Sequence, residues 1–152
     1  SSYFINTFSN SINLNKKDII KNLEAKLPHY TFLEIKNMKY DVYKEYASKA
    51  KFAITFGEGL DGYLTETIFS GGISFGVYNK VYFTDDFKNL PSIYHSFNEL
   101  NEKIVEDIKY YDTLEHYNTY HNQLYTIVTK SYSYDIFKEK VTQFYLKNFD
   151  FK

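Results

Sequence analysis

The near-continuous apolar run Phe52–Phe56, which ends in Gly57-Glu58-Gly59, most constrains what this chain can fold into. Strands that are buried on both faces occur mainly in parallel sheets with helices on either side. Their sequences are short apolar runs bounded by turn residues such as glycine. The run therefore predicts the central strand of a parallel sheet.

Strand-like and helix-like segments alternate along the rest of the chain. The apolar patterns predict three further strands and three helices, at 3–8, 30–35 and 73–78 and at about 16–27, 40–51 and 62–70 respectively. A short strand at 81–84, an irregular stretch around Pro91 and three helical segments follow, the first behind the capping-box pattern Ser96-Phe-Asn-Glu99. This alternation predicts a Rossmann-like, three-layer α/β domain that binds ligands at the carboxyl ends of its strands.

Length and composition indicate one domain over residues 1–152. The first residue is Ser1, so we expect a fragment of a longer polypeptide. No apolar stretch reaches the roughly 18 residues of a membrane span and no signal peptide is visible, which predicts a soluble, untargeted chain. The absence of cysteine is compatible with the cytoplasm.

Charge and aromatic content narrow the class of partner. All 18 basic residues are lysines, and 19 acidic residues bring the net charge to −1. Nucleic-acid binding usually needs a surplus of positive charge, so we expect no nucleic-acid partner. The 17 Tyr and 14 Phe are spread along the whole chain, which favours packing over stacking platforms for a ligand.

The segment 57–66 carries the chemistry that a ligand site needs. Its glycines, Gly57, Gly59 and Gly62, would let the backbone approach a ligand, and the helix that follows would present N–H groups to a diphosphate. Glu58 and Glu66 can each accept hydrogen bonds from the adjacent hydroxyls of a ribose or hexose. The pattern favours recognition of a sugar nucleotide, and the alternative is that Glu58 and Glu66 are a solvated loop residue and an exposed helix residue.

This segment resembles the donor site of the retaining glycosyltransferases of the GT-B fold, especially the large family-four group. That site has an apolar strand, two glutamates separated by seven residues, a short helix, and then a small residue and glycine before another strand. The matching stretch here runs from Phe52 through Glu58 and Glu66 to Gly71-Gly72. Segments 98–110 and 131–138 also resemble helices of the family, so the resemblance covers about residues 40–147.

The resemblance implies the carboxy-terminal, donor-binding half of a metal-independent hexosyltransferase that needs no cofactor. Glu58 would contact the transferred sugar as the catalytic residue, Glu66 would bind the ribose, and backbone amides near Gly57 and Gly59 would meet the phosphates. The acceptor, a glycan or a lipid-linked sugar, would bind a separate amino-terminal half, without which this chain would barely catalyse. The parent enzyme would build bacterial capsule or lipopolysaccharide in the cytoplasm, with peripheral attachment to the inner face of the membrane as a further option.

One departure from the family concerns the phosphates. The family usually places an arginine and a lysine after the first strand, and this chain contains no arginine. Lys16 or Lys17 could substitute as point charges, without the bidentate contact of a guanidinium. The alternative is that both are solvated lysines at the start of a helix.

Other chemistries have less support. No Asp-x-Asp triplet is present to hold the metal ion of a GT-A glycosyltransferase. Asp85-Asp86 is similar to the acidic pair of receiver domains, but it follows a late strand. His116 and His121 are five apart, which misses the spacing of a helical metal pair. The competing class is a non-catalytic α/β module that contacts a protein or a free carbohydrate through its loop glutamates.

Overall fold

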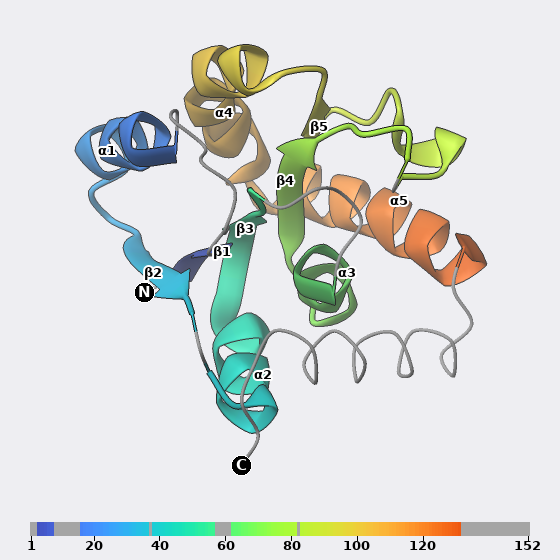
Figure 1. Cartoon of the computed structure of the whole chain (residues 1–152), viewed down its shortest axis with the longest axis horizontal. Coiled ribbons are helices and arrows are strands. Elements are labelled where there is room, and N and C mark those ends of the chain that lie inside the picture. The colour runs from blue at the N-terminus through green and yellow to red at the C-terminus, as the bar shows by residue number, and fades with distance from the viewer. Residues whose placement is uncertain (1–2, 8–15, 37, 57–61, 82, 132–152) are drawn as a thin grey trace.

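The computed structural model describes residues 3–7, 16–36, 38–56, 62–81 and 83–131 of the chain (Figure 1). Strands and helices alternate as the apolar pattern predicts, up to β4. Five strands form one parallel sheet in the order β2-β1-β3-β4-β5. The strands are β1 (Tyr3–Thr7), β2 (Thr31–Ile35), β3 (Ala50–Ile54), β4 (Ile73–Val77) and β5 (Ile93–Tyr94). The predicted Rossmann-like α/β fold is confirmed.

In the described part of the chain, five α-helices surround the sheet. They are α1 (Lys16–Lys26), α2 (Tyr40–Lys49), α3 (Gly62–Phe69), α4 (Phe97–Tyr111) and α5 (Leu114–Ser131). Helix α1 contacts α4, and α2 contacts α3 (Figure 1). The connection from β1 through α1 to β2 runs in one direction along the sheet, whereas those through α2 to β3 and through α3 to β4 run in the other. Because such connections are right-handed, α1 lies on one face of the sheet and α2 and α3 lie on the other. The apolar faces of both groups of helices are thereby buried against the same sheet.

The core between these layers is largely aromatic. The largest fully buried side chains include Tyr43, Phe52, Phe56, Phe75 and Phe87. The Phe52 ring lies 5.9 Å from that of Phe75, centre to centre, and adjacent strands β3 and β4 carry the two rings. The reading of the aromatic residues as packing residues is confirmed for this core.

Helix α5 covers the amino-terminal edge of β3, β4 and β5. The Tyr117 hydroxyl donates to the carbonyl oxygen of Lys51, at the start of β3 (3.1 Å), and to that of Gly71, just before β4 (2.6 Å). The backbone N–H of Ser92, just before β5, donates to the Tyr120 hydroxyl at 3.0 Å. This edge is therefore occupied by helix contacts, and a ligand site on the sheet belongs at the opposite, carboxyl edge.

Two parts of the region after β4 differ from the prediction. Of the predicted strand 81–84, the described residues 81, 83 and 84 are not in a strand, and Val81 is 74% exposed. The fifth strand instead lies in the stretch predicted to be irregular, where the Gly76 and Tyr78 N–H groups donate to Ser92 and Tyr94. A strand of two residues is too short to show an alternating pattern, so its pairing with β4 decides where it forms.

The Gly71-Gly72 pair ends α3 in a Schellman motif. The Gly71 N–H donates to Ile68 and the Gly72 N–H to Thr67, which satisfies carbonyl groups at the end of the helix. Gly71 has φ +100°, a conformation that favours glycine. A Cβ on Gly72 would lie 2.7 Å from Thr67 Cγ2 and 3.0 Å from the Ala50 carbonyl oxygen. Position 71 therefore needs glycine because of its backbone angle, and position 72 needs glycine because there is no room for a side chain.

We expect Gly72→Ala and Gly71→Ala each to lower the free energy of unfolding by about 1–2 kcal/mol. The causes differ, because a Cβ on Gly71 meets nothing within 4 Å. Gly71→Asn should therefore recover part of the loss, since asparagine tolerates positive φ, whereas no residue larger than glycine should restore position 72. Urea denaturation measures all three variants, and equal losses for Gly71→Asn and Gly71→Ala would contradict the backbone explanation.

Candidate functional site

The candidate site lies at the carboxyl edge of the sheet, between β1 and β3. The strand order reverses there, because β2 lies on one side of β1 while β3, β4 and β5 lie on the other. Doubly wound α/β domains bind ligands outside the carboxyl ends of the strands at such a switch point. The predicted donor segment, 57–66, starts three residues after the end of β3. The topology therefore places Phe56, the last described residue before this segment, at the edge of the sheet where ligands bind in such folds.

Lys16 is the charged residue that the structure brings to this position. It is the first residue of α1, and its Nζ lies 3.2 Å from Glu34 Oε2, near the end of β2. The same Nζ lies 5.4 Å from the centre of the Phe56 ring, just after β3. Because β1 lies between β2 and β3, these contacts hold the ammonium over the carboxyl end of β1.

The two candidate lysines differ in their surroundings. Lys17 is exposed, as the solvated alternative predicts. That alternative is wrong for Lys16, whose side chain is only 17% exposed and is paired with Glu34. Of the two, Lys16 is therefore the residue placed to meet an anion at the switch point.

Glu66 lies in the middle of α3 and is only 3% exposed. The alternative of an exposed helix residue is therefore wrong for Glu66. Thr65 and Thr67 beside it are also buried, so this polar turn of α3 faces the interior. A ligand would contact the Glu66 carboxylate only after displacing the groups that cover it.

The surroundings of Glu66 change its acidity. Burial raises the pKa of Glu66, because it disfavours the charged form, while the charge of Lys44 on α2 and a hydrogen bond from Ser70 oppose the rise. The net shift is upward. Ionisation of a buried carboxyl group lowers the stability of the fold. Groups with pKa values shifted in this way are common at functional sites.

The remaining predicted residues are Glu58 and the three glycines Gly57, Gly59 and Gly62. Glu58, Gly57 and Gly59 lie outside the described residues, so the expectation that Glu58 and Glu66 face one cleft stays a prediction. Gly62 is the first residue of α3, and this agrees with the predicted start of that helix. The first turn of a helix has N–H groups without partners inside the helix, which can face a phosphate.

Three residues near the site were not predicted. Glu34 pairs with Lys16, Phe56 lies under the Lys16 ammonium, and the charge of Lys44 opposes the rise in the pKa of Glu66. Phe56 ends the apolar run, so its position next to the loop could have been read from the sequence. Glu34 and Lys44 belong to other elements, and only the packing of those elements brings them here.

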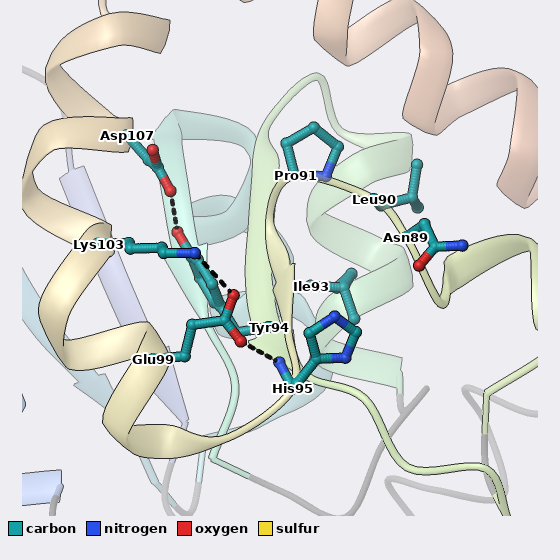
Figure 2. A pocket seen from close by; sticks show the side chains of 9 residues that line it. All are labelled: Asn89, Leu90, Pro91, Ile93, Tyr94, His95, Glu99, Lys103 and Asp107. Atoms are coloured by element: carbon teal, nitrogen blue, oxygen red, sulfur yellow. Dashed lines mark hydrogen bonds and ion pairs between the residues drawn. The ribbon is translucent and has the colours of Figure 1, made fainter.

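A hollow of about 320 Å³ lies elsewhere, along β5 and α4 (Figure 2). Several of the polar groups that line it are paired with one another. Tyr94 donates to Asp107 at 2.6 Å, and Glu99 accepts from the His95 N–H at 2.9 Å and from Lys103 at 3.1 Å. One half of the capping box predicted at Ser96 is present, because the Ser96 hydroxyl accepts from the Glu99 N–H. The Glu99 carboxylate accepts from the N–H of His95, the residue before the cap, and not from that of Ser96 as the capping box requires. These contacts stabilise the edge of the sheet and the start of α4, so the hollow is not our candidate site.

Two kinds of feature are absent from the described residues. Among the described residues, no group of three or more His, Cys, Asp or Glu side chains is arranged to hold a metal ion. In the same part of the chain, no helix has both the length and the apolar character of a membrane span. The expected metal independence of the chemistry stays a prediction.

Comparison with known proteins adds no relative. The chain matched no protein-family model, no curated protein and no solved structure. The functional assignment therefore depends on the residues and on the geometry described above.

Proposed function

We propose that this chain is the donor-binding domain of a retaining glycosyltransferase and binds a nucleoside-diphosphate sugar at the carboxyl edge of its sheet. The observation that carries the proposal is the strand order, because the strand before the Glu58–Glu66 segment is one of the two at the switch point. Many ligands bind at switch points, so the residues there must supply the specificity.

Each part of the proposed donor has a matching group. The diphosphate would meet the Lys16 ammonium and the first N–H groups of α3, starting at Gly62. The ribose hydroxyls would donate to Glu66 after displacing the groups that cover it. The Glu66 carboxylate can accept about four hydrogen bonds, one of them from Ser70. Glu58, which precedes α3 in the sequence, would contact the transferred sugar.

The chemistry proposed for the parent enzyme is transfer with retention of configuration. Its barrier falls when the leaving diphosphate and an oxocarbenium-like centre are stabilised. Lys16 and the start of α3 would stabilise the leaving group, while Glu58 and Glu66 would orient the sugar and the ribose. The acceptor, a glycan or a lipid-linked sugar, would come from a separate domain, and the cytoplasmic site of surface-polysaccharide assembly belongs to the same proposal.

Calorimetric titration of the chain with UDP, GDP, CMP and dTDP tests this function. We expect one of the four to bind with a dissociation constant between micromolar and millimolar, and its identity names the base. Lys16→Met should weaken that binding, whereas Lys21→Met, an exposed lysine on the same helix, should not. If none of the four binds at millimolar concentration, the proposal is contradicted and the interaction-module class is favoured.

A further inference from the structure

Glu34 is paired with Lys16, the cation that the proposed site offers to a diphosphate. Its Oε2 lies 3.2 Å from Lys16 Nζ, and the two side chains come from different elements, β2 and α1. Glu34 is 47% exposed, whereas the Lys16 side chain is 17% exposed and lies against the Phe56 ring. The lysine is therefore held in place, while its partner borders on solvent.

We propose that Glu34 is a displaceable counterion, which neutralises Lys16 in the empty site and gives way to the diphosphate of the donor. The inference rests on the proposed function, and it adds a residue that sets which ligands the site accepts. A ligand must carry enough negative charge to replace Glu34. Glu34 would thus lower the affinity of the site for anions, whereas the preference for nucleoside diphosphates over nucleosides and neutral sugars would come from Lys16.

The different exposure of the two side chains supports this exchange. A cation that is mostly removed from water is costly unless an opposite charge or a ring face compensates it. Glu34 and the Phe56 ring supply both here. A half-exposed carboxylate can return to water at little cost, because exposed ion pairs contribute only about 0–1 kcal/mol. A diphosphate can replace it because phosphate oxygens pair with ammonium groups at least as well.

The place of Lys16 explains why a counterion is needed at all. Its ammonium lies over the carboxyl end of β1, between residues of β2 and β3. The start of α1 adds partial positive charge at the same point, although Asp18 in the first turn offsets part of it. Without Glu34 the positive charge at this position would be greater, and anions would bind there more readily. With Glu34 present, an anion must displace it, and a ligand with several negative charges gains more from that exchange than a singly charged one.

The experiment measures inorganic pyrophosphate binding to the whole chain by calorimetry at low ionic strength, in wild type and in Glu34→Gln. We expect Glu34→Gln to bind pyrophosphate about two- to fivefold more tightly. Glu24→Gln is the matched control, because Glu24 is exposed, lies near the other end of α1 and carries the same charge. Adding Lys16→Met to Glu34→Gln should remove the gain. Glu34 is on the surface, so glutamine is not expected to disturb folding, and circular dichroism checks this.

The same variants are titrated with UDP, GDP and dTDP and with the matching nucleosides. We expect Glu34→Gln to tighten binding of the diphosphate that binds wild type and to leave its nucleoside unchanged. The inference is overturned if pyrophosphate fails to bind any variant, if its affinity is equal in wild type and Glu34→Gln, or if Glu24→Gln gives the same gain. A gain for pyrophosphate with no nucleotide binding would keep the counterion and reject the proposed function. Nucleotide binding that depends on Glu66 but not on Glu34 would support the proposed function and reject Glu34 as a displaceable counterion.

Discussion

Glu66→Gln is expected to weaken nucleotide binding at least about tenfold and to leave the chain as stable as wild type or more stable. Hydrogen bonds to a charged acceptor contribute about 1.5–3 kcal/mol each, and glutamine keeps the shape of the side chain but loses the charge. Calorimetry with the nucleotide that binds wild type measures the first effect. Thermal unfolding measures the second.

The expected effect on stability follows from the sign of the pKa shift. The pKa of Glu66 in the folded chain is raised above its ordinary value of 4.5, so folding favours the protonated form. The stability that this proton supplies is complete below pH 4.5 and is lost as the pH rises through the folded pKa. Glutamine does not titrate. The midpoint of unfolding of Glu66→Gln relative to wild type should therefore be higher at pH 8 than at pH 4.

Glu102→Gln is the matched control, because Glu102 is an exposed glutamate on α4. It should change neither the nucleotide affinity nor the midpoint of unfolding by more than a small amount. If Glu66→Gln lowers stability and leaves nucleotide binding unchanged, Glu66 is a structural residue of α3. The assignment of the ribose to Glu66 would then be wrong.

Asp112→Asn is expected to lower the free energy of unfolding by about 2–3 kcal/mol at neutral pH. Asp112 follows α4, and its carboxylate accepts from Lys51 Nζ at 2.5 Å and lies 3.5 Å from His29 Nε2. It also accepts a hydrogen bond from the buried Tyr30. The Asp112 carboxylate, in the turn between α4 and α5, thus contacts both β3 and the chain just before β2. These contacts lie at the edge of the sheet opposite to the candidate site. Removing its charge leaves a partly buried Lys51 without its counterion.

The pH dependence of this effect has the opposite sign to that of Glu66. Burial by itself raises the pKa of Asp112, but the hydrogen bonds from Lys51 and Tyr30 and the charge of Lys51 outweigh it, and the net pKa is lowered. The contribution of Asp112 is therefore complete above its ordinary value of 3.8 and is lost as the pH falls through the folded pKa. The difference between wild type and Asp112→Asn should shrink below pH 3.8.

Urea denaturation at several pH values measures this difference. Asp86→Asn removes an exposed aspartate from the 3₁₀ helix 85–87 and serves as the control, with an expected change within about 0.5 kcal/mol. A loss for Asp112→Asn no larger than that of the control would show that the carboxylate does not hold these elements together. Nucleotide binding should not change in either variant, since neither residue is among those proposed to bind the donor.

The position of the candidate site could be predicted from the sequence, but the residues that complete it could not. The run Phe52–Phe56 and the glycines after it indicated a strand that ends in a loop, because both signals are local. Lys16 and Lys17 could not be told apart. Neighbouring residues on a helix point about 100° apart, so the way α1 packs decides which lysine faces the sheet.

The sequence by itself determined the alternation of strands and helices up to β4, since apolar periodicity depends only on neighbours along the chain. The α/β class and the parallel sheet followed from that alternation. The tertiary structure decided the strand order, the short strand β5, the burial of Glu66 and the pairing of Lys16 with Glu34. These features depend on contacts between elements distant in the sequence, and a glutamate in a helix pattern is ordinarily expected on the surface. Packing of α3 against α2 and the sheet put this one inside, because the free energy gained by burying the neighbouring apolar residues outweighs the cost of covering one carboxyl group.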